Sequence, residues 1–221
     1  MPGVGHLPPA HRRFGVYLGL FLSIWTAYVL LVYRHLQALG DDSFLYAVAN
    51  MAVRLTVWVG PVILMLWFVD RVAPLRALGL VDRWKRGVLI GICLFALLLA
   101  IALLQFGWPH GVARRLTWQS VLGTSFGVGF YEEIPFRGYI LQKLGTRMNF
   151  WLANALTSVI FVGMHLPGWL MLNLFALRLA LYVFAFSFVL GAVFHYSRSL
   201  WSCIIGHSAN NFVSAVLFGG R

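Results

Sequence analysis

The stretch GVLIGICLFALLLAIALLQFGW, residues 87–108, contains no charged side chain. An α-helix rises about 1.5 Å per residue, so a run of this length crosses the roughly 30 Å hydrocarbon core of a bilayer. Lipid offers no hydrogen-bond partner to backbone groups, which leaves helices and closed barrels as the spanning structures. Because the run is continuously apolar and does not alternate, it predicts a transmembrane helix.

The remainder of the chain has the same character. Of its 221 residues, 61% are hydrophobic and 10% are charged, whereas soluble domains carry about 25% charged residues. We therefore expect an all-α fold, a polytopic transmembrane helical bundle of about seven spans. Pro167 and Gly168 could end the fifth helix early or start a re-entrant piece, so six or eight spans are also compatible with the sequence. The predicted spans are 14–33, a segment within 43–69, 87–108, 116–142, 150–169, 170–196 and 199–220.

The net charge of +11 indicates how the chain lies in the membrane. Most basic residues fall between the apolar runs, which favours contact with lipid headgroups over nucleic acid, and no basic stripe or base-stacking platform is present. With the N-terminus inside, the inside segments hold more Lys and Arg than the outside ones, chiefly through the cluster at 71–86. We expect a multi-pass membrane protein with membrane lipids as partners and the N-terminus inside.

The only two glutamates are adjacent and lie inside the fourth apolar run. A charge at bilayer depth costs about 2.5–3.5 kcal/mol on insertion scales, so Glu132 and Glu133 need a reason to be there. Glu133 and Arg137 are four residues apart on one helical face and are expected to pair. Glu132 lies about 100° round the helix and is expected to face a cavity. Pro135 predicts a kink beside them. The alternative is a purely structural ion triad.

Two later spans carry the other buried polar residues. His165 lies in the fifth span, and His207 and Asn211 share one face of the last span, four residues apart. Each could serve only as a hydrogen-bonded contact between helices. Together with Glu132 they can perform amide hydrolysis: the carboxylate deprotonates a water that His165 helps to position, and His207 and Asn211 donate hydrogen bonds to the oxyanion.

A metal is the other chemistry open to the same residues. Glu132, His165 and His207 are also the ligand types of catalytic zinc, so a divalent metal such as zinc is an alternative to a metal-free glutamate mechanism. The chain has no H-E-x-x-H motif. The sequence does not decide between the two mechanisms.

Three motifs in order resemble one known family. Glu132-Glu133-x-x-x-Arg137, Phe161-x-x-x-His165 and His207-x-x-x-Asn211 resemble the EExxxR, FxxxH and HxxxN motifs of the CPBP family, which includes type II CAAX prenyl endopeptidases and bacteriocin-processing and self-immunity proteins and is also called ABI. The resemblance covers roughly 117–218. It implies an intramembrane endopeptidase in which Glu132 is the acid/base, His165 acts on the water, His207 and Asn211 stabilise the oxyanion, and Glu133 and Arg137 support the site.

The resemblance, the charge distribution and the short loops together suggest an organisation and a range of functions. We expect a cytoplasmic tail at 1–13, peripheral spans at 14–108 and a catalytic core at 109–221, in a bacterial cytoplasmic (inner) membrane. The expected partner is a protein or peptide substrate, with lipidated substrates included. A non-catalytic scaffold or self-immunity protein that keeps the motifs is the alternative function. A transporter or proton relay is the third, although no inverted repeat is visible.

Overall fold

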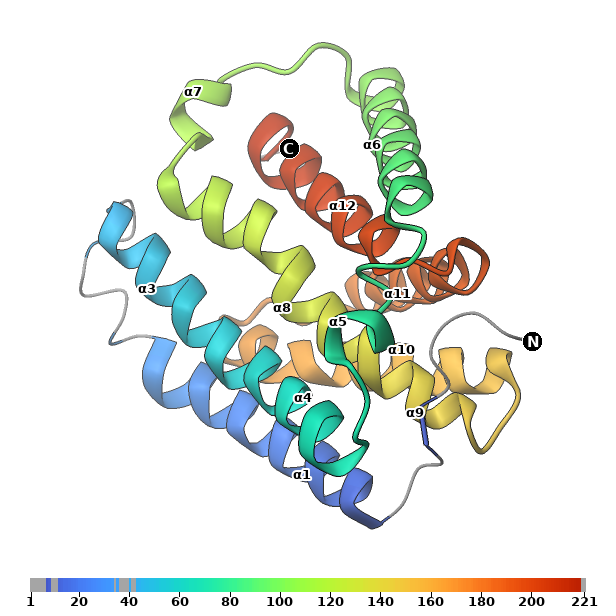
Figure 1. Cartoon of the computed structure of the whole chain (residues 1–221). Coiled ribbons are helices and arrows are strands. Elements are labelled where there is room, and N and C mark those ends of the chain that lie inside the picture. The colour runs from blue at the N-terminus through green and yellow to red at the C-terminus, as the bar shows by residue number, and fades with distance from the viewer. Residues whose placement is uncertain (1–6, 9–11, 34, 36–39, 41–42, 220–221) are drawn as a thin grey trace.

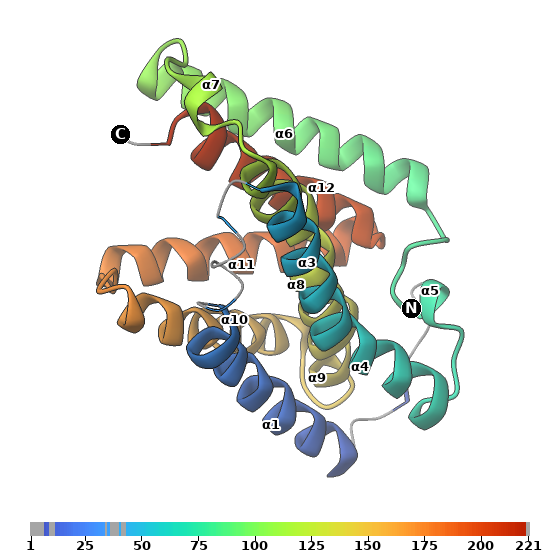
Figure 2. The same ribbon diagram turned by 90° about the vertical axis from the view of Figure 1, so that its left-hand side faces the viewer.

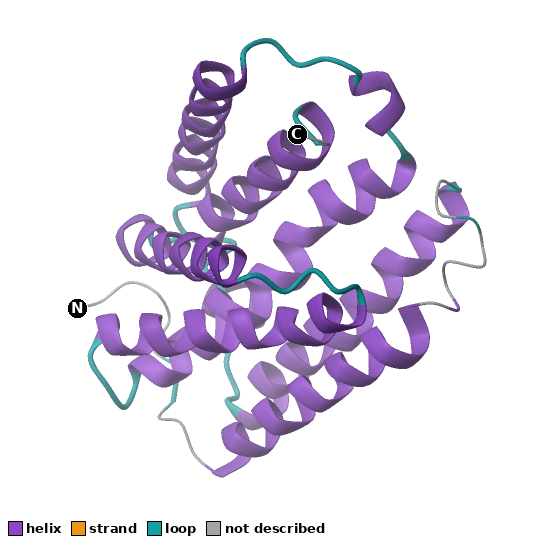
Figure 3. Cartoon of the chain, turned by 180° about the vertical axis from the view of Figure 1, so that it is seen from behind, coloured by secondary structure: helices purple, strands orange, loops and turns teal. Residues whose placement is uncertain are grey.

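The computed structural model describes residues 7–8, 12–33, 35, 40 and 43–219. Within these ranges every regular element is a helix, and Figure 3 shows only helices and loops. The predicted all-α membrane fold is therefore confirmed. Most of the predicted N-terminal tail lies outside the described residues, as does the last residue of the seventh predicted span, Gly220.

Five helical segments are long and apolar enough to cross a membrane, among the residues that the structure describes. Three of them are single α-helices. The other two continue from an α-helix into π-helical turns, in which each backbone N–H bonds five residues back. The segments are Arg12–Val32, which begins with α1 (Arg12–Ala27); Phe44–Val69, which contains α3 (Phe44–Arg54) and α4 (Gly60–Leu64); α6 (Trp84–Phe106); α10 (Phe150–Met171); and α11 (Leu177–Ser197).

The other two predicted spans are also continuous helical segments, but they are more polar. One runs from Gln119 to Gly145 through α8 (Val128–Pro135) and α9 (Leu141–Gly145), and the other joins α12 (Leu200–Asn211) to a π-helical turn that ends at Leu217. The first segment carries Glu132 and Glu133, and the second carries His207 and Asn211. These polar residues lower the hydropathy of both segments below that of the other five. Two short helices, α5 (Pro74–Ala77) and α7 (Val112–Arg115), lie in connections.

The polar segments lie in the middle of the bundle. Figures 1 and 2 show α8 and α9 running between α3–α4 on one side and α12 on the other, with α6 beyond α12. α10 and α11 pack against each other as an antiparallel pair, and α11 also packs on α12. The outer face is apolar: Leu104 is 89% exposed and Phe68 is 69% exposed, which suits contact with lipid and not with water.

The break between the fifth and sixth spans differs from the prediction. α10 continues through Pro167 to Met171, and α11 starts only at Leu177. Pro167 therefore does not end the helix. An unwound backbone at this depth would leave N–H and C=O groups without partners in lipid, and transmembrane helices tolerate proline for that reason.

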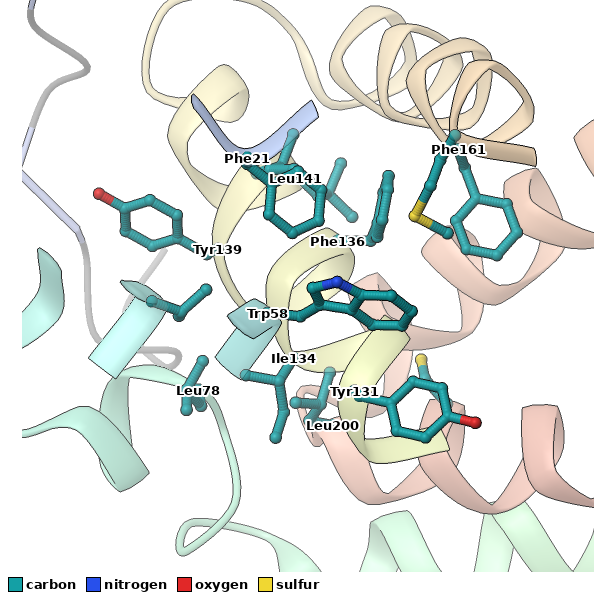
Figure 4. Close-up of a cluster of buried hydrophobic side chains, with 14 of the residues drawn as sticks. Phe21, Trp58, Leu78, Tyr131, Ile134, Phe136, Tyr139, Leu141, Phe161 and Leu200 are labelled. Atoms are coloured by element: carbon teal, nitrogen blue, oxygen red, sulfur yellow. The ribbon is translucent and has the colours of Figure 1, made fainter. Parts of the chain in front are cut away.

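Aromatic side chains fill the space where these helices meet. Figure 4 shows Trp58, Tyr131, Phe136 and Phe161 in this cluster, and each is at most 1% exposed. The Phe136 and Phe161 rings pack edge to face with their centroids 4.8 Å apart, and Trp58 packs on Tyr131 at 5.1 Å. The first contact joins the turn Phe136–Ile140, which follows α8, to α10, and the second joins α8 to the Phe44–Val69 segment.

Candidate active site

A fully buried ion cluster lies at the centre of the bundle. Glu133 Oε1 accepts a hydrogen bond from Arg137 Nη1 at 2.9 Å, and both side chains are 0% exposed. The pairing predicted from their four-residue spacing is confirmed. Arg137 Nη2 also donates to the backbone oxygen and to Oγ of Ser187, both at 2.8 Å, which ties this pair to α11.

His207 connects the two glutamates. Its Nδ1 lies 2.6 Å from Glu133 Oε1, and its Nε2 lies 3.9 Å from Glu132 Oε2. An ionised carboxylate only accepts hydrogen bonds, so Nδ1 carries the hydrogen in this pair and Nε2 faces Glu132. Glu132 is 6% exposed, and no direct hydrogen bond to its carboxylate is among those that the described residues make. The two neighbouring carboxylates therefore have different surroundings.

Local sequence features bring α8 against α12. Gly129 has no side chain, and a Cβ there would lie 2.6 Å from Ser208 Oγ and 3.0 Å from the carbonyl carbon of Ile204. Pro135 cannot donate to the carbonyl of Tyr131, and a π-helical turn, Phe136–Ile140, follows it directly. The regular helix thus ends beside the acids, where the proline predicted a disturbance.

His165 lies beside the cluster without entering it. Its Nδ1 is 2.8 Å from the carbonyl oxygen of Phe161, one turn earlier in α10. The Phe161 ring lies between the two histidines, with its centroid 4.9 Å from that of His165 and 6.0 Å from that of His207. It also lies 4.9 Å from the guanidinium carbon of Arg137. The backbone bond orients the imidazole so that Nε2 remains the free nitrogen.

Asn211 lies one helical turn beyond His207 on α12. Its Nδ2 donates to the carbonyl oxygen of Thr124 at 3.0 Å, and its Oδ1 accepts from Asn210 Nδ2 at 3.3 Å. Tyr182 on α11 in turn donates to Asn210 Oδ1 at 2.8 Å. The amide of Asn211 is therefore held in place and keeps a second N–H for another acceptor.

The structure brings four predicted residues into one cluster: Glu132, Glu133, Arg137 and His207. It also adds residues that sequence reasoning missed. Phe161 was treated only as a motif letter, but its ring contacts three site residues. Arg54 is the lone charged residue of the predicted span within 43–69, and the sequence alone does not predict its neighbours. That lone charge at bilayer depth was the available signal.

The predicted metal set fits only in part. Both histidines engage Nδ1 in a hydrogen bond and leave Nε2 free, which is the usual arrangement for metal-ligating histidines. Yet no three His, Cys, Asp or Glu side chains gather at ligand spacing in the part of the chain that the structure describes. The three predicted ligands, Glu132, His165 and His207, therefore do not form a metal site as they lie.

These observations define a class: a multi-pass helical membrane protein with a buried, histidine-bridged pair of carboxylates. Residues 113–213 match the family model described as type II CAAX prenyl endopeptidase Rce1-like. That segment contains all three motifs, and the resemblance drawn from them is confirmed. Neither the curated proteins nor the solved structures gave a match to this chain.

Proposed function

We propose that this protein is an intramembrane endopeptidase that cleaves peptide bonds in membrane-associated or lipidated proteins or peptides. One observation carries the proposal: Glu132 is a buried carboxylate facing the imidazole of His207, within a segment that matches a CAAX endopeptidase family. A buried carboxylate at this depth is costly and is typical of function. The catalytic core would comprise 109–221 and the peripheral spans 14–108. The protein would lie in a bacterial inner membrane with its N-terminus on the cytoplasmic side.

The proposed reaction is the attack of water on a peptide carbonyl. Glu132 takes a proton from the water as its oxygen bonds to the carbonyl carbon, and the carbonyl oxygen becomes an oxyanion. Glu132 then returns this proton to the amide nitrogen as the carbon–nitrogen bond breaks, which yields a carboxylic acid and an amine. His165 accepts a hydrogen bond from the water through Nε2, because its Nδ1 is engaged with the Phe161 carbonyl.

The remaining residues stabilise charge and hold the geometry. His207 donates a hydrogen bond to the oxyanion from Nε2 in its doubly protonated form, in which Nδ1–H is bound to Glu133, and Asn211 donates through its second N–H. Removal of such donors in other enzymes costs about 10²–10³ in rate each. Glu133 and Arg137 support the site by fixing His207 through Nδ1. This orienting contact plays the part of the carboxylate that aligns a catalytic histidine in other hydrolases.

The test is peptidase activity of the purified protein in detergent against a peptide library that includes lipidated peptides. Wild type should cleave, and Glu132→Gln should not, at a temperature at which both proteins remain folded in detergent. Asp82→Asn is the matched control, because Asp82 is an exposed carboxylate outside the site. Equal cleavage by wild type and Glu132→Gln would show that Glu132 is not the base. Loss of activity without loss of the fold would support the proposal.

A further inference from the structure

We propose that Arg54 supplies the positive charge that balances Glu132, and that it is a positioning residue for this carboxylate. Arg54 lies in the Phe44–Val69 segment, outside the part of the chain that matches the family. The catalytic meaning of this inference rests on the proposed function. The charge balance itself does not, and it can be tested separately.

Neutral groups hold Arg54 in one place. Its Nε donates to Asn50 Oδ1 at 3.1 Å and to Tyr28 Oη at 3.3 Å, and its Nη1 donates to Tyr131 Oη at 3.2 Å. Its guanidinium carbon lies 5.1–5.7 Å from the ring centroids of Tyr28, Trp58 and Tyr131. These contacts fix the side chain, but none of them neutralises its charge.

The charges of the other carboxylates are already balanced, among the residues that the structure describes. Glu133 is bound by Arg137 and His207, and Asp70 is bound by Lys143 at 2.6 Å. Asp82 pairs with Arg76 on the exposed surface at 3.7 Å. Among the described residues, Glu132 has one ion-pair contact within 4.0 Å, which is with His207 Nε2 at 3.9 Å. It is the one described carboxylate left to balance a guanidinium at membrane depth.

Tyr131 links the two groups. It precedes Glu132 in α8, accepts the hydrogen bond from Arg54 Nη1, and donates its own hydroxyl hydrogen to the carbonyl of Gly123. α8 packs directly on the turn Leu55–Val59 that follows Arg54. Because Tyr131 and Glu132 are consecutive residues of α8, the hydrogen bond to Tyr131 holds the Arg54 guanidinium beside the part of the helix that carries Glu132. The charge of Arg54 therefore acts on Glu132 from the side formed by the second span.

The arrangement suits a carboxylate that must stay free to take a proton. A directly bound guanidinium occupies a carboxylate oxygen, as Arg137 does on Oε1 of Glu133. Neutral acceptors hold the Arg54 cation beside Tyr131, the residue before Glu132. From there it stabilises the negative charge of Glu132 and leaves both of its carboxylate oxygens open to water. Because Asn50, Tyr28 and Tyr131 already hold the guanidinium in place, its charge needs no reorganisation during the reaction.

A double-variant cycle tests the charge balance without any assay of activity. Arg54→Met leaves Glu132 unbalanced and should lower the unfolding midpoint in detergent, and adding Glu132→Gln should recover at least about 3 °C relative to the sum of the single shifts. Arg54→Met with Asp82→Asn should be additive. If Arg54→Met alone yields no folded protein, the double variant with Glu132→Gln must yield a measurable amount of folded protein. Additivity of Arg54→Met with Glu132→Gln, or failure to recover folded protein, would overturn the proposal.

Kinetics test the positioning role. Arg54→Lys keeps the charge and should retain kcat within about tenfold of wild type, whereas Arg54→Met should lose roughly 100-fold with KM little changed. An equal loss of activity in both variants at equal fold content would show that the hydrogen bonds of the guanidinium matter and its charge does not, and wild-type activity in both would show that neither matters; either result would overturn the positioning role. If wild type cleaves nothing while the stability cycle still shows coupling, the proposed protease function fails and the charge balance stands.

Discussion

Gly129→Ala should separate α8 from α12 and disable the site. The added Cβ would lie 3.0 Å from the Ile204 carbonyl carbon, whereas ordinary contacts begin at 3.4 Å, and the carbonyl oxygen of Ile204 is closer still. The Ser208 hydroxyl can rotate away, but backbone cannot. The two helices must therefore move apart by at least about 0.4 Å, and overpacking of this kind costs about 1–3 kcal/mol.

This cost converts into a measurable shift. For a chain of this size, each kcal/mol lowers the unfolding midpoint by about 2–4 °C, so Gly129→Ala should unfold about 2–12 °C below wild type. The 2.6 Å contact between Glu133 and His207 joins the same two helices, and its loss should reduce peptidase activity by about 100-fold.

Gly163→Ala is the matched control. Gly163 also lies within a long helix, but a Cβ there meets nothing within 4 Å. Alanine is the better helix former by about 1 kcal/mol, so this variant should be as stable as wild type or more so. The comparison uses thermal unfolding in detergent and cleavage of one peptide. If Gly129→Ala matches Gly163→Ala in both, the close contact of α8 with α12 does not control the site.

Three further changes probe the buried charges and the metal alternative. Arg137→Met should cost about 3–5 kcal/mol because Glu133 loses its cation, and adding Glu133→Gln should recover part of it in thermal unfolding; no recovery would contradict the pairing. Lys143→Met should cost a similar amount, and Asp70→Asn in the same chain should restore stability, with simple additivity as the contrary result. Dialysis against a strong chelator should leave the unfolding midpoint and peptidase activity unchanged, and loss of both, restored by zinc, would favour the metal mechanism.

Features that depend on neighbouring residues could be predicted from the sequence. The apolar runs predict helices because lipid leaves backbone groups no other partners, and the helices were found where the runs lie. The Glu133–Arg137 pair was predictable because residues four apart share a helical face. Pro135 marked the change in helical geometry, since its missing N–H acts on the preceding turn.

Helix ends were harder to predict. Pro167 suggested an early end to the fifth span, but α10 continues to Met171. The effect of a proline depends on whether neighbouring helices and lipid leave the freed backbone groups any alternative, and a local sequence window does not contain that information.

The sequence determined which residues are buried and polar, and its three motifs identified the family segment. Only the tertiary structure decided how these residues meet. His207 reaches Glu133 from 74 positions away, and the Phe161 ring packs on both histidines. Arg54 bonds to Tyr131 from a span outside the matched segment. The physical reason is that hydropathy and helical spacing fix contacts within one helix, whereas contacts between helices depend on close approach at positions such as Gly129 and on packing of side chains from several spans at once.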